Sequence, residues 1–197
     1  MQTEVRFLTI TGRPGSGKSY LIKRILDALP DHAEIFAGKS YTTREPRDDD
    51  VPGEYAYVVP AAFRNMEVRG EFSWVFKHGH YKVGTRGFDI HAALKQNVIS
   101  VMTLVPEAAA ELIEIVGENR IVSFLCEAPE EQCAERLRRR STGAEKALAR
   151  LVSTRHWTRE HMADLYIPHV YLDTSDEVPP AESALRLVLE TLRSREK

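Results

Sequence analysis

A glycine-rich octapeptide near the amino end constrains the fold more than any other stretch of this chain. Residues 12–19 read Gly-Arg-Pro-Gly-Ser-Gly-Lys-Ser and fit the pattern G-x-x-x-x-G-K-[ST]. In such a loop the backbone N–H groups converge on a polyphosphate, because glycines carry no side chain that would keep the phosphate away. The predicted phosphate-binding residues are Gly12, Gly15, Ser16, Gly17, Lys18 and Ser19.

The last two residues of this loop carry the chemistry that the pattern predicts. Lys18 would reach the β- and γ-phosphates of ATP as a catalytic cation, and the Ser19 hydroxyl would help to hold Mg²⁺ through the nucleotide. The flanking sequence supports this prediction. Residues 5–11 form a β-rich apolar run, and Leu21 begins a series of apolar residues at helical spacing that stops at Pro30. Strand, loop and helix in this order place a phosphate at a helix N-terminus.

Composition limits the classes of protein that need to be considered. The chain has 197 residues, is 43% hydrophobic and 28% charged, and has a formal net charge of −2. These values suit one domain and argue against a nucleic-acid-coating surface. Cys126 and Cys133 lack zinc-site spacing and are predicted to be reduced thiols. With no signal peptide or membrane-length apolar run, we expect a soluble cytoplasmic protein, a monomer or homodimer, without nucleic-acid or membrane partners.

Strands and helices alternate along most of the chain. The predicted strands span residues 5–11, 33–37, 55–59, 72–76, 81–83, 98–105, 121–126 and 169–172, and the predicted helices span residues 21–29, 61–69, 90–96, 106–116, 129–140, 144–156 and 185–192. Alternation of this kind predicts βαβ units and an α/β fold of three layers around a parallel sheet. Residues 38–85 differ, with short alternating runs and turn signals, and are predicted to form a small mixed α/β lobe inserted into the core.

Several strings in this inserted segment make the chain resemble the guanylate kinase family, whose members are P-loop nucleoside monophosphate kinases. They are Ser-Tyr-Thr-Thr-Arg-Glu-Pro-Arg at 40–47, Gly-Glu-Tyr-Ala-Tyr-Val at 53–58 and Gly-Glu-Phe at 70–72, followed by Tyr81 and by Gly84-Thr85. The resemblance extends from the phosphate loop to about residue 173. It implies a core at 1–37, 86–135 and 156–197, a monophosphate-binding lobe at 38–85 and a helical lid at 136–155.

Two arginines in the first of these strings are suited to hold a second phosphate. Two arginines three residues apart can both grip the same phosphate dianion, each with a bidentate fork. By resemblance, Arg44 and Arg47 hold the acceptor monophosphate, together with tyrosine hydroxyls, and Arg44 is also catalytic. The other predicted acceptor-binding residues are Ser40, Tyr55, Glu71, Tyr81 and Thr85, with Ser40 contacting the base. Tyr57 is predicted to be a packed strand residue.

The lid implied by the resemblance supplies further cations. Phosphoryl transfer needs positive charge around the transferring group and exclusion of water. Arg136, Arg140 and Arg150 are predicted to reach the phosphates, and Arg140 and Arg150 are predicted to be catalytic. Arg138 and Arg139 are interpreted as a solvated helix face that complements the helix dipole.

The chain departs from the family pattern where guanine would be read. Family members carry D-x-D at the end of the strand at 98–103, where this chain has Ser-Val-Met at 100–102, and an acid after G-E-F, where it has Ser73 or Trp74. Guanine presents N–H donors, and a donor without an acceptor in a closed site costs about 1–3 kcal/mol. Glu71 could substitute, and Thr103 or Ser73 could accept more weakly.

The inserted segment also contains a pair of histidines and a run of three aspartates, and neither is predicted to bind a ligand. His78 and His80, near the predicted hairpin, are interpreted as turn residues and not as metal ligands. The acidic triplet at 48–50 is interpreted as a solvated loop.

Three functional hypotheses remain open. The first is an ATP- and Mg²⁺-dependent kinase that converts GMP or dGMP to the diphosphate. The second keeps the chemistry and uses ribose 1,5-bisphosphate as the acceptor, which the missing acids favour. The third is a phosphoprotein-binding module derived from such a kinase, which the intact Gly-Lys-Ser at 17–19 disfavours.

Overall fold

The computed structural model describes residues 5–28, 35–48, 50–96, 98–139, 144–175 and 182–194. Arg140 and the tip of the predicted lid at 141–143 lie outside these residues. Within the described ranges, no helix combines the length and the apolar character that crossing a lipid bilayer requires.

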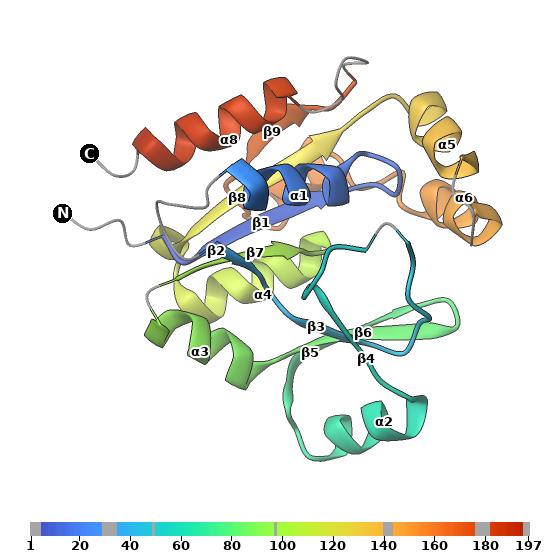
Figure 1. Cartoon of the computed structure of the whole chain (residues 1–197), viewed down its shortest axis with the longest axis vertical. Coiled ribbons are helices and arrows are strands. Elements are labelled where there is room, and N and C mark those ends of the chain that lie inside the picture. Colours follow the sequence, from blue (N-terminus) through green and yellow to red (C-terminus); the bar gives the residue numbers. More distant parts are fainter. Residues whose placement is uncertain are drawn as a thin grey trace.

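A parallel sheet of five strands forms the centre of the molecule (Figure 1). In spatial order its strands are β2 (Ile35–Ala37), β7 (Ile99–Thr103), β1 (Phe7–Gly12), β8 (Ile121–Glu127) and β9 (Val170–Asp173). All six residues of β1 are buried, because this strand lies between neighbours and is covered on both faces. Continuous apolar strands of this kind are typical of parallel sheets.

Helices cover both faces of this sheet (Figure 1). On one face lie α1 (Lys18–Ala28) and α8 (Glu182–Ser194), and on the other lie α3 (Gly87–Gln96) and α4 (Pro106–Val116). Alternate residues of β1 face opposite layers of the core: Leu8 packs with α1, whereas Phe7 packs with the α4 residue Leu112. The predicted three-layer α/β fold is therefore confirmed.

A second, mixed sheet carries the inserted segment, as predicted. Its strands are β4 (Tyr55–Tyr57), β3 (Ser40–Thr42), β6 (Tyr81–Arg86) and β5 (Phe72–His78), and α2 (Pro60–Val68) packs beside them. The predicted hairpin is present, with His78 opposite Tyr81. The pairing register shifts between Phe72 and Trp74, and the Trp74 side chain is 6% exposed.

Helices α5 (Glu130–Arg138) and α6 (Ala144–Ser153), which carry most of the segment predicted to form a lid and are named the lid helices for that reason, lie at the end of the molecule toward which the strands of the main sheet point (Figure 1). They pack on each other through a separate apolar cluster that contains Cys133, Leu137 and Leu151. This small core keeps the two helices together as a unit.

The structure differs from the sequence-based expectations at several elements. Strand β3, the short helix α7 (Arg159–Asp164) and the 3-10 turn η1 (Glu118–Arg120) were not predicted. Conversely, the strand predicted at 98–105 ends at Thr103, because Leu104 and Val105 leave the sheet and continue to the proline that opens α4. The helix predicted at 144–156 ends at Ser153.

Candidate functional site

A cavity of about 1290 Å³ lies among the phosphate loop, the second sheet and the lid helices. It occurs at the carboxyl ends of the main strands, where open α/β sheets bind ligands. Most of the predicted site residues line it: Gly12, Gly15, Gly17, Lys18, Ser19, Ser40, Arg44, Arg47, Tyr55, Tyr81, Arg136 and Arg150. Ser16, Glu71 and Thr85 do not line it, and Arg140 lies outside the described residues.

The phosphate loop needs glycine at positions that the structure identifies. Gly15 has φ +80°, and a Cβ there would lie 2.4 Å from the backbone oxygen of Cys133. Gly17 has φ +88°, and a Cβ there would meet no atom within 4 Å. Glycine at position 15 allows the loop to pack against α5, and glycine at position 17 is required by its positive φ and leaves open space on that side of the loop. A concavity with converging backbone N–H groups suits a phosphate.

Lys18 is the first residue of α1, and its ammonium group lies over the loop. Its Nζ donates to the backbone oxygens of Gly12 at 2.7 Å and Arg13 at 2.8 Å. Ser16 is 1% exposed, and its N–H donates to the Arg13 oxygen at 3.1 Å, so it supports the loop from beneath. Ser19 lines the cavity next to Lys18.

Arg44 is held on the opposite wall by an acidic partner that the sequence analysis did not identify. Its guanidinium group donates to both carboxylate oxygens of Asp50, at 2.8 and 2.5 Å, and lies 4.4 Å from the centre of the Tyr55 ring. The residue is only 9% exposed. Burial alone would lower the pKa of Arg44, but the Asp50 carboxylate reverses that effect, and the net shift is upward.

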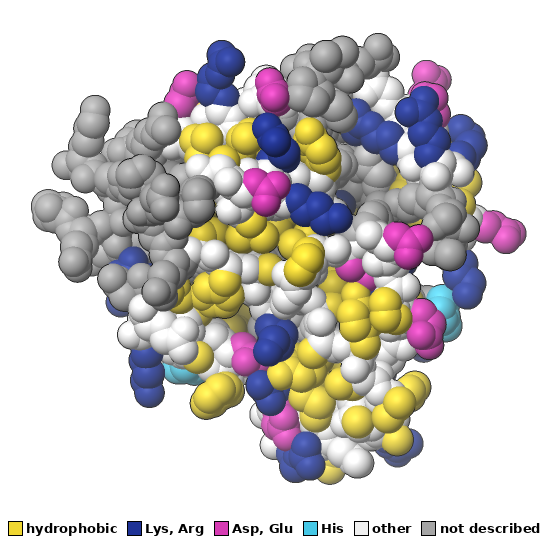
Figure 2. All heavy atoms as spheres, in the orientation of Figure 1, with side chains coloured by type: hydrophobic (Ala, Val, Ile, Leu, Met, Phe, Trp, Pro, Cys, Tyr) yellow, Lys and Arg dark blue, Asp and Glu magenta, His cyan; other side chains and the backbone are white. Residues whose placement is uncertain are grey.

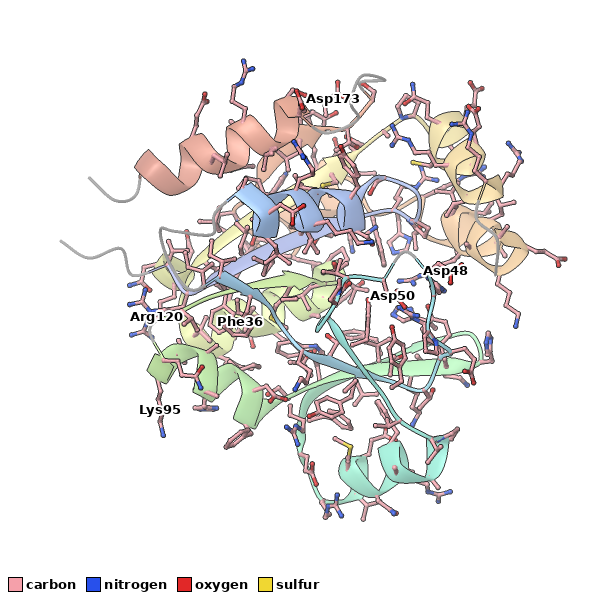
Figure 3. All side chains as sticks on the ribbon, in the orientation of Figure 1. Phe36, Asp48, Asp50, Lys95, Arg120 and Asp173 are labelled. Atoms are coloured by element: carbon pink, nitrogen blue, oxygen red, sulfur yellow. The ribbon has the colours of Figure 1, made fainter. Side chains whose placement is uncertain are left out.

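Asp50 accepts two further hydrogen bonds. The N–H of Arg47 donates to it at 2.7 Å and the Tyr57 hydroxyl donates at 2.5 Å. Burial acts to raise its pKa, but the hydrogen bonds from Arg44 and Tyr57 outweigh burial and lower it. Figure 3 shows Asp48 and Asp50 on the connection between β3 and β4, on the side facing the lid helices.

The structure differs from the expectations for Asp50 and Tyr57. The solvated-loop interpretation is wrong for Asp50, whose side chain is 15% exposed and bound to Arg44. Tyr57 does lie in a strand, but it is 38% exposed and not packed, because its hydroxyl reaches across to Asp50.

The remaining predicted acceptor residues occupy different places on the second sheet. Ser40 is buried, and its hydroxyl lies 3.4 Å from that of Thr85, which is itself buried behind it. The side chain of Arg47 is half-buried at the cavity wall. Burial raises the pKa of the Tyr55 hydroxyl. At neutral pH this hydroxyl is therefore a neutral hydrogen-bond donor.

Glu71 does not meet the expectation that it faces the acceptor. Its carboxylate accepts from Arg69 at 2.6 Å and lies 3.9 Å from Arg86, outside the cavity. The cavity contains a different acid, Glu54, which is 3% exposed. Burial raises the pKa of Glu54, and the nearby hydroxyls of Thr103 and Tyr55 act against that shift. Glu54 is a site residue that was not predicted from the sequence, although its place directly before Tyr55 is a usable signal.

Three arginines of the lid line the cavity: Arg136, Arg139 and Arg150. The solvated-face interpretation therefore describes Arg139 only in part, because its side chain is exposed and yet borders the cavity. Arg136 donates to the Gly15 oxygen at 3.3 Å and to the Thr174 oxygen at 2.8 Å, so it ties α5 to the phosphate loop. Arg150 donates to the Tyr81 hydroxyl at 3.0 Å. Burial, with a smaller contribution from Arg150, lowers the pKa of His78 to about 4. The lid and the hairpin of the second sheet are thus in contact across the cavity.

A second link joins the lid to the phosphate loop. Arg13 donates to Glu130 at 2.7 Å and to the Leu151 oxygen at 3.0 Å, and Arg155 also pairs with Glu130. Hydrogen bonds from Arg155 and Arg13 lower the pKa of Glu130 to about 2. Figure 2 shows Lys and Arg side chains gathered over the part of this face where α5 and α6 lie.

The donor set fits Mg²⁺ only in company with a nucleotide. Mg²⁺ takes oxygen ligands, keeps several waters and is usually held by one or two protein groups plus substrate phosphates. Ser19 offers one hydroxyl at the cavity wall. The strand end at β7 presents Thr103 and not a carboxylate, and the Asp50 carboxylate is engaged by Arg44.

Comparisons with known proteins agree with this geometry. A family model described as "Guanylate kinase" matches residues 4–178. The chain is 24% identical over 188 residues to a guanylate kinase of Sulfurimonas denitrificans, with 94% of this chain and 87% of that protein covered. It is 30% identical over 157 residues to one of Prochlorococcus marinus, with 78% and 82% covered.

A solved structure shares the fold. The crystal structure of guanylate kinase from Anaplasma phagocytophilum superposes with a TM-score of 0.68 at 17% identity, covering 99% of this chain and 88% of that one. The same fold is therefore present at a sequence identity too low to carry site residues across.

Proposed function

This chain belongs to the guanylate kinase family, and on that premise we propose that it is an ATP-dependent kinase that phosphorylates a purine nucleoside monophosphate, GMP or dGMP, to the diphosphate. The observation that carries the proposal is that one cavity is lined by the phosphate loop, by Arg44 and Arg47, and by the lid residue Arg150. Two groups that we expect to bind anions, and that are far apart in the sequence, therefore line the same cavity.

In the proposed reaction the donor phosphates occupy the glycine loop. Lys18 moves from the loop carbonyls to the β- and γ-phosphates when ATP binds, because a phosphate oxygen is a stronger acceptor for an ammonium group than a carbonyl. Bound Mg²⁺, held through Ser19 and the nucleotide, supplies charge neutralisation at the transferring group. Arg136 stands beside the loop, where it can pair with the donor.

The acceptor phosphate lies against the second sheet in this scheme. Arg47 and the Tyr55 hydroxyl bind it, and Arg44, oriented by Asp50, faces it from the same wall. An oxygen of the acceptor phosphate attacks the γ-phosphorus in line while the bond to the ADP oxygen breaks. No general base is required, because the attacking oxygen is already an anion. Positioning and electrostatic stabilisation supply the rate.

The acceptor base is assigned to the region around Ser40, Glu54 and Thr103. Guanine presents an N1–H and a 2-amino group, both of which need acceptors. Glu54 is the buried acid of this wall, and its carboxylate can accept from both. It therefore takes over the role of the two family acids that the sequence lacks.

A second acceptor is retained because of one specific observation. Near the end of β7 the chain has Ser-Val-Met at 100–102 where the family pattern has acids, and the adjacent Thr103 lines the cavity with a hydroxyl, which suits a sugar as well as a base. Ribose 1,5-bisphosphate would place one phosphate against Arg44 and Arg47 and its hydroxyls near Glu54. GMP and ribose 1,5-bisphosphate differ in their hydrogen-bond donors, so an assay with several acceptors distinguishes the two hypotheses.

The test is a coupled assay of ADP release with GMP, dGMP, IMP, AMP and ribose 1,5-bisphosphate, comparing the wild type with Glu54→Gln. IMP lacks the 2-amino group that Glu54 would bind. We expect turnover of GMP and a preference for GMP over IMP that falls about tenfold in Glu54→Gln, which corresponds to one hydrogen bond to a charged group. The matched control is Glu45→Gln, an exposed acid at the cavity rim.

Three outcomes would count against parts of this proposal. No turnover with any acceptor would overturn the kinase function. Turnover of ribose 1,5-bisphosphate alone would replace the acceptor. An unchanged GMP to IMP ratio in Glu54→Gln would remove Glu54 from the base site.

A further inference from the structure

Two imidazoles and one carboxylate converge outside the phosphate cavity. Ligand atoms of Glu107, His156 and His161 all lie within 4.8 Å of one another. None of the three lines the cavity. Glu107 lies in the first turn of α4, His156 follows α6 and His161 lies in α7, so the fold brings together residues some fifty positions apart. The hypotheses for the kinase reaction use none of them.

The backbone of His161 is held in place, but one nitrogen of its ring has no hydrogen-bond partner among the described residues. Nε2 of His161 is shielded from solvent, has no hydrogen-bond partner among the described residues and lies 3.6 Å from Oε1 of Glu107. The backbone of His161 is fixed, because its N–H donates to the capping hydroxyl of Thr158 at 3.3 Å. The ring of His156 stands 5.1 Å away and nearly perpendicular, at 78°.

We propose that these three residues bind one divalent transition-metal ion of the zinc type. Imidazole nitrogen and carboxylate oxygen are common ligands of zinc, whereas Mg²⁺ and Ca²⁺ prefer oxygen ligands alone. Zinc–ligand bonds of roughly 2.0–2.2 Å place neighbouring ligand atoms about 3.4 Å apart in a tetrahedron. The ligand atoms already lie within 4.8 Å of one another, and the side chains of Glu107 and His156 are accessible enough to solvent to turn toward that spacing while His161 stays in place. Water completes the fourth position.

The location gives such an ion a structural consequence. Next to His156 is Trp157, which is 7% exposed, lines the cavity and faces the Arg150 guanidinium at 5.8 Å. Next to Glu107 is Ala108, which also lines the cavity. A bound ion therefore joins the start of α4 to the chain that leaves the lid. It acts as a brace behind the cavity wall and not as part of the phosphate site.

The experiment uses the full chain, stripped of metal, in buffer without nucleotide or magnesium. Equilibrium dialysis against Zn²⁺ is expected to give one bound ion per chain. Zinc at 100 times its Kd is expected to raise Tm by roughly 5–10 °C. Substituting Co²⁺ provides a visible absorption spectrum that reports nitrogen and oxygen ligation. Glu107→Gln and His161→Gln are each expected to weaken zinc binding at least about tenfold.

Matched controls distinguish this site from others. Glu114→Gln changes an exposed acid of the same helix, and His80→Gln changes the histidine pair of the hairpin. Both should bind zinc as the wild type does. Far-UV circular dichroism and retained ATP binding show that each variant is folded. The proposal is overturned if the wild type shows no saturable zinc binding, if folded Glu107→Gln binds as tightly as the wild type, or if binding is lost in His80→Gln instead.

Discussion

Arg44 is a buried arginine in a loop whose composition suggests solvent exposure. The residue is 9% exposed, and its guanidinium group lies over two tyrosine rings and donates two hydrogen bonds to Asp50. An arginine so enclosed is oriented before any ligand arrives, which reduces the entropy lost on binding. Sequence spacing predicted that Arg44 and Arg47 belong together, but it did not identify Asp50 as the residue that orients one of them.

The pair makes a prediction for stability at acid pH. The pKa of Asp50 is lower in the folded chain than in the unfolded chain, so its contribution is complete above the unfolded pKa of about 3.9 and is lost as pH falls through the folded pKa. Asp50→Asn should therefore lower the free energy of unfolding at pH 7 by about 1–3 kcal/mol. As the pH falls below 4, the variant should lose less stability than the wild type does. Urea unfolding at several pH values tests this. If Asp50→Asn lowered the free energy of unfolding by the same amount at pH 7 and at pH 2.5, the prediction would be wrong.

The two arginines should differ in what their removal does. Arg47→Ala should raise the acceptor KM by at least tenfold, as expected for a lost charged hydrogen bond, with little effect on stability. Arg44→Ala should do the same and also destabilise the chain, because it leaves Asp50 buried without its cation. Steady-state kinetics with GMP and thermal unfolding separate the two. An unchanged KM in both variants would show that the acceptor phosphate binds elsewhere.

Among the helices and strands, tertiary packing determines features that the local sequence propensity does not predict. Helix α4 has an apolar face that the sequence predicted, and the structure buries Leu112 completely while Ile115 remains 42% exposed. In contrast, β3 has only three residues and α7 only six, and neither has the length that makes a periodic pattern visible. They form because β3 lies between β4 and β6 and because Thr158 caps α7.

Helix α4 offers a matched pair of substitutions. Leu112→Ala should cost about 2–5 kcal/mol, because it opens a cavity beneath β1. Ile115 lies about one turn further along the same helix and is partly exposed. Ile115→Ala should therefore change the free energy of unfolding by less than about 1 kcal/mol. Chemical denaturation of both variants measures the difference. Equal costs would mean that α4 does not pack on the sheet as described.

For the whole molecule, the cavity wall consists of three parts that meet around an open space. The lid touches the phosphate loop through Arg13 and Arg136 and touches the hairpin through Arg150 and Tyr81. Each proposed substrate would contact a different pair of these parts. Binding of both would therefore order the lid more than binding of either one.

Thermal unfolding with substrates tests this coupling. A non-hydrolysable ATP analogue and GMP added together should raise Tm by more than the sum of their separate shifts, because the first ligand already holds the lid that the second needs. The matched control is Arg150→Ala, in which the shifts should become additive. Additive shifts in the wild type would show that the lid does not couple the two sites.

The sequence by itself determined the parts of this protein that depend on local spacing. The phosphate loop, its strand and helix, the α/β alternation and the two loop arginines are short-range patterns, readable because a helix repeats every 3.6 residues and a buried strand is continuously apolar. The tertiary structure alone decided which groups meet. It placed Glu54 in the cavity and Glu71 outside it, enclosed Asp50 with Arg44, and brought His156 and His161 to Glu107. These contacts depend on how sheets and helices pack across the core, and no local spacing encodes that packing.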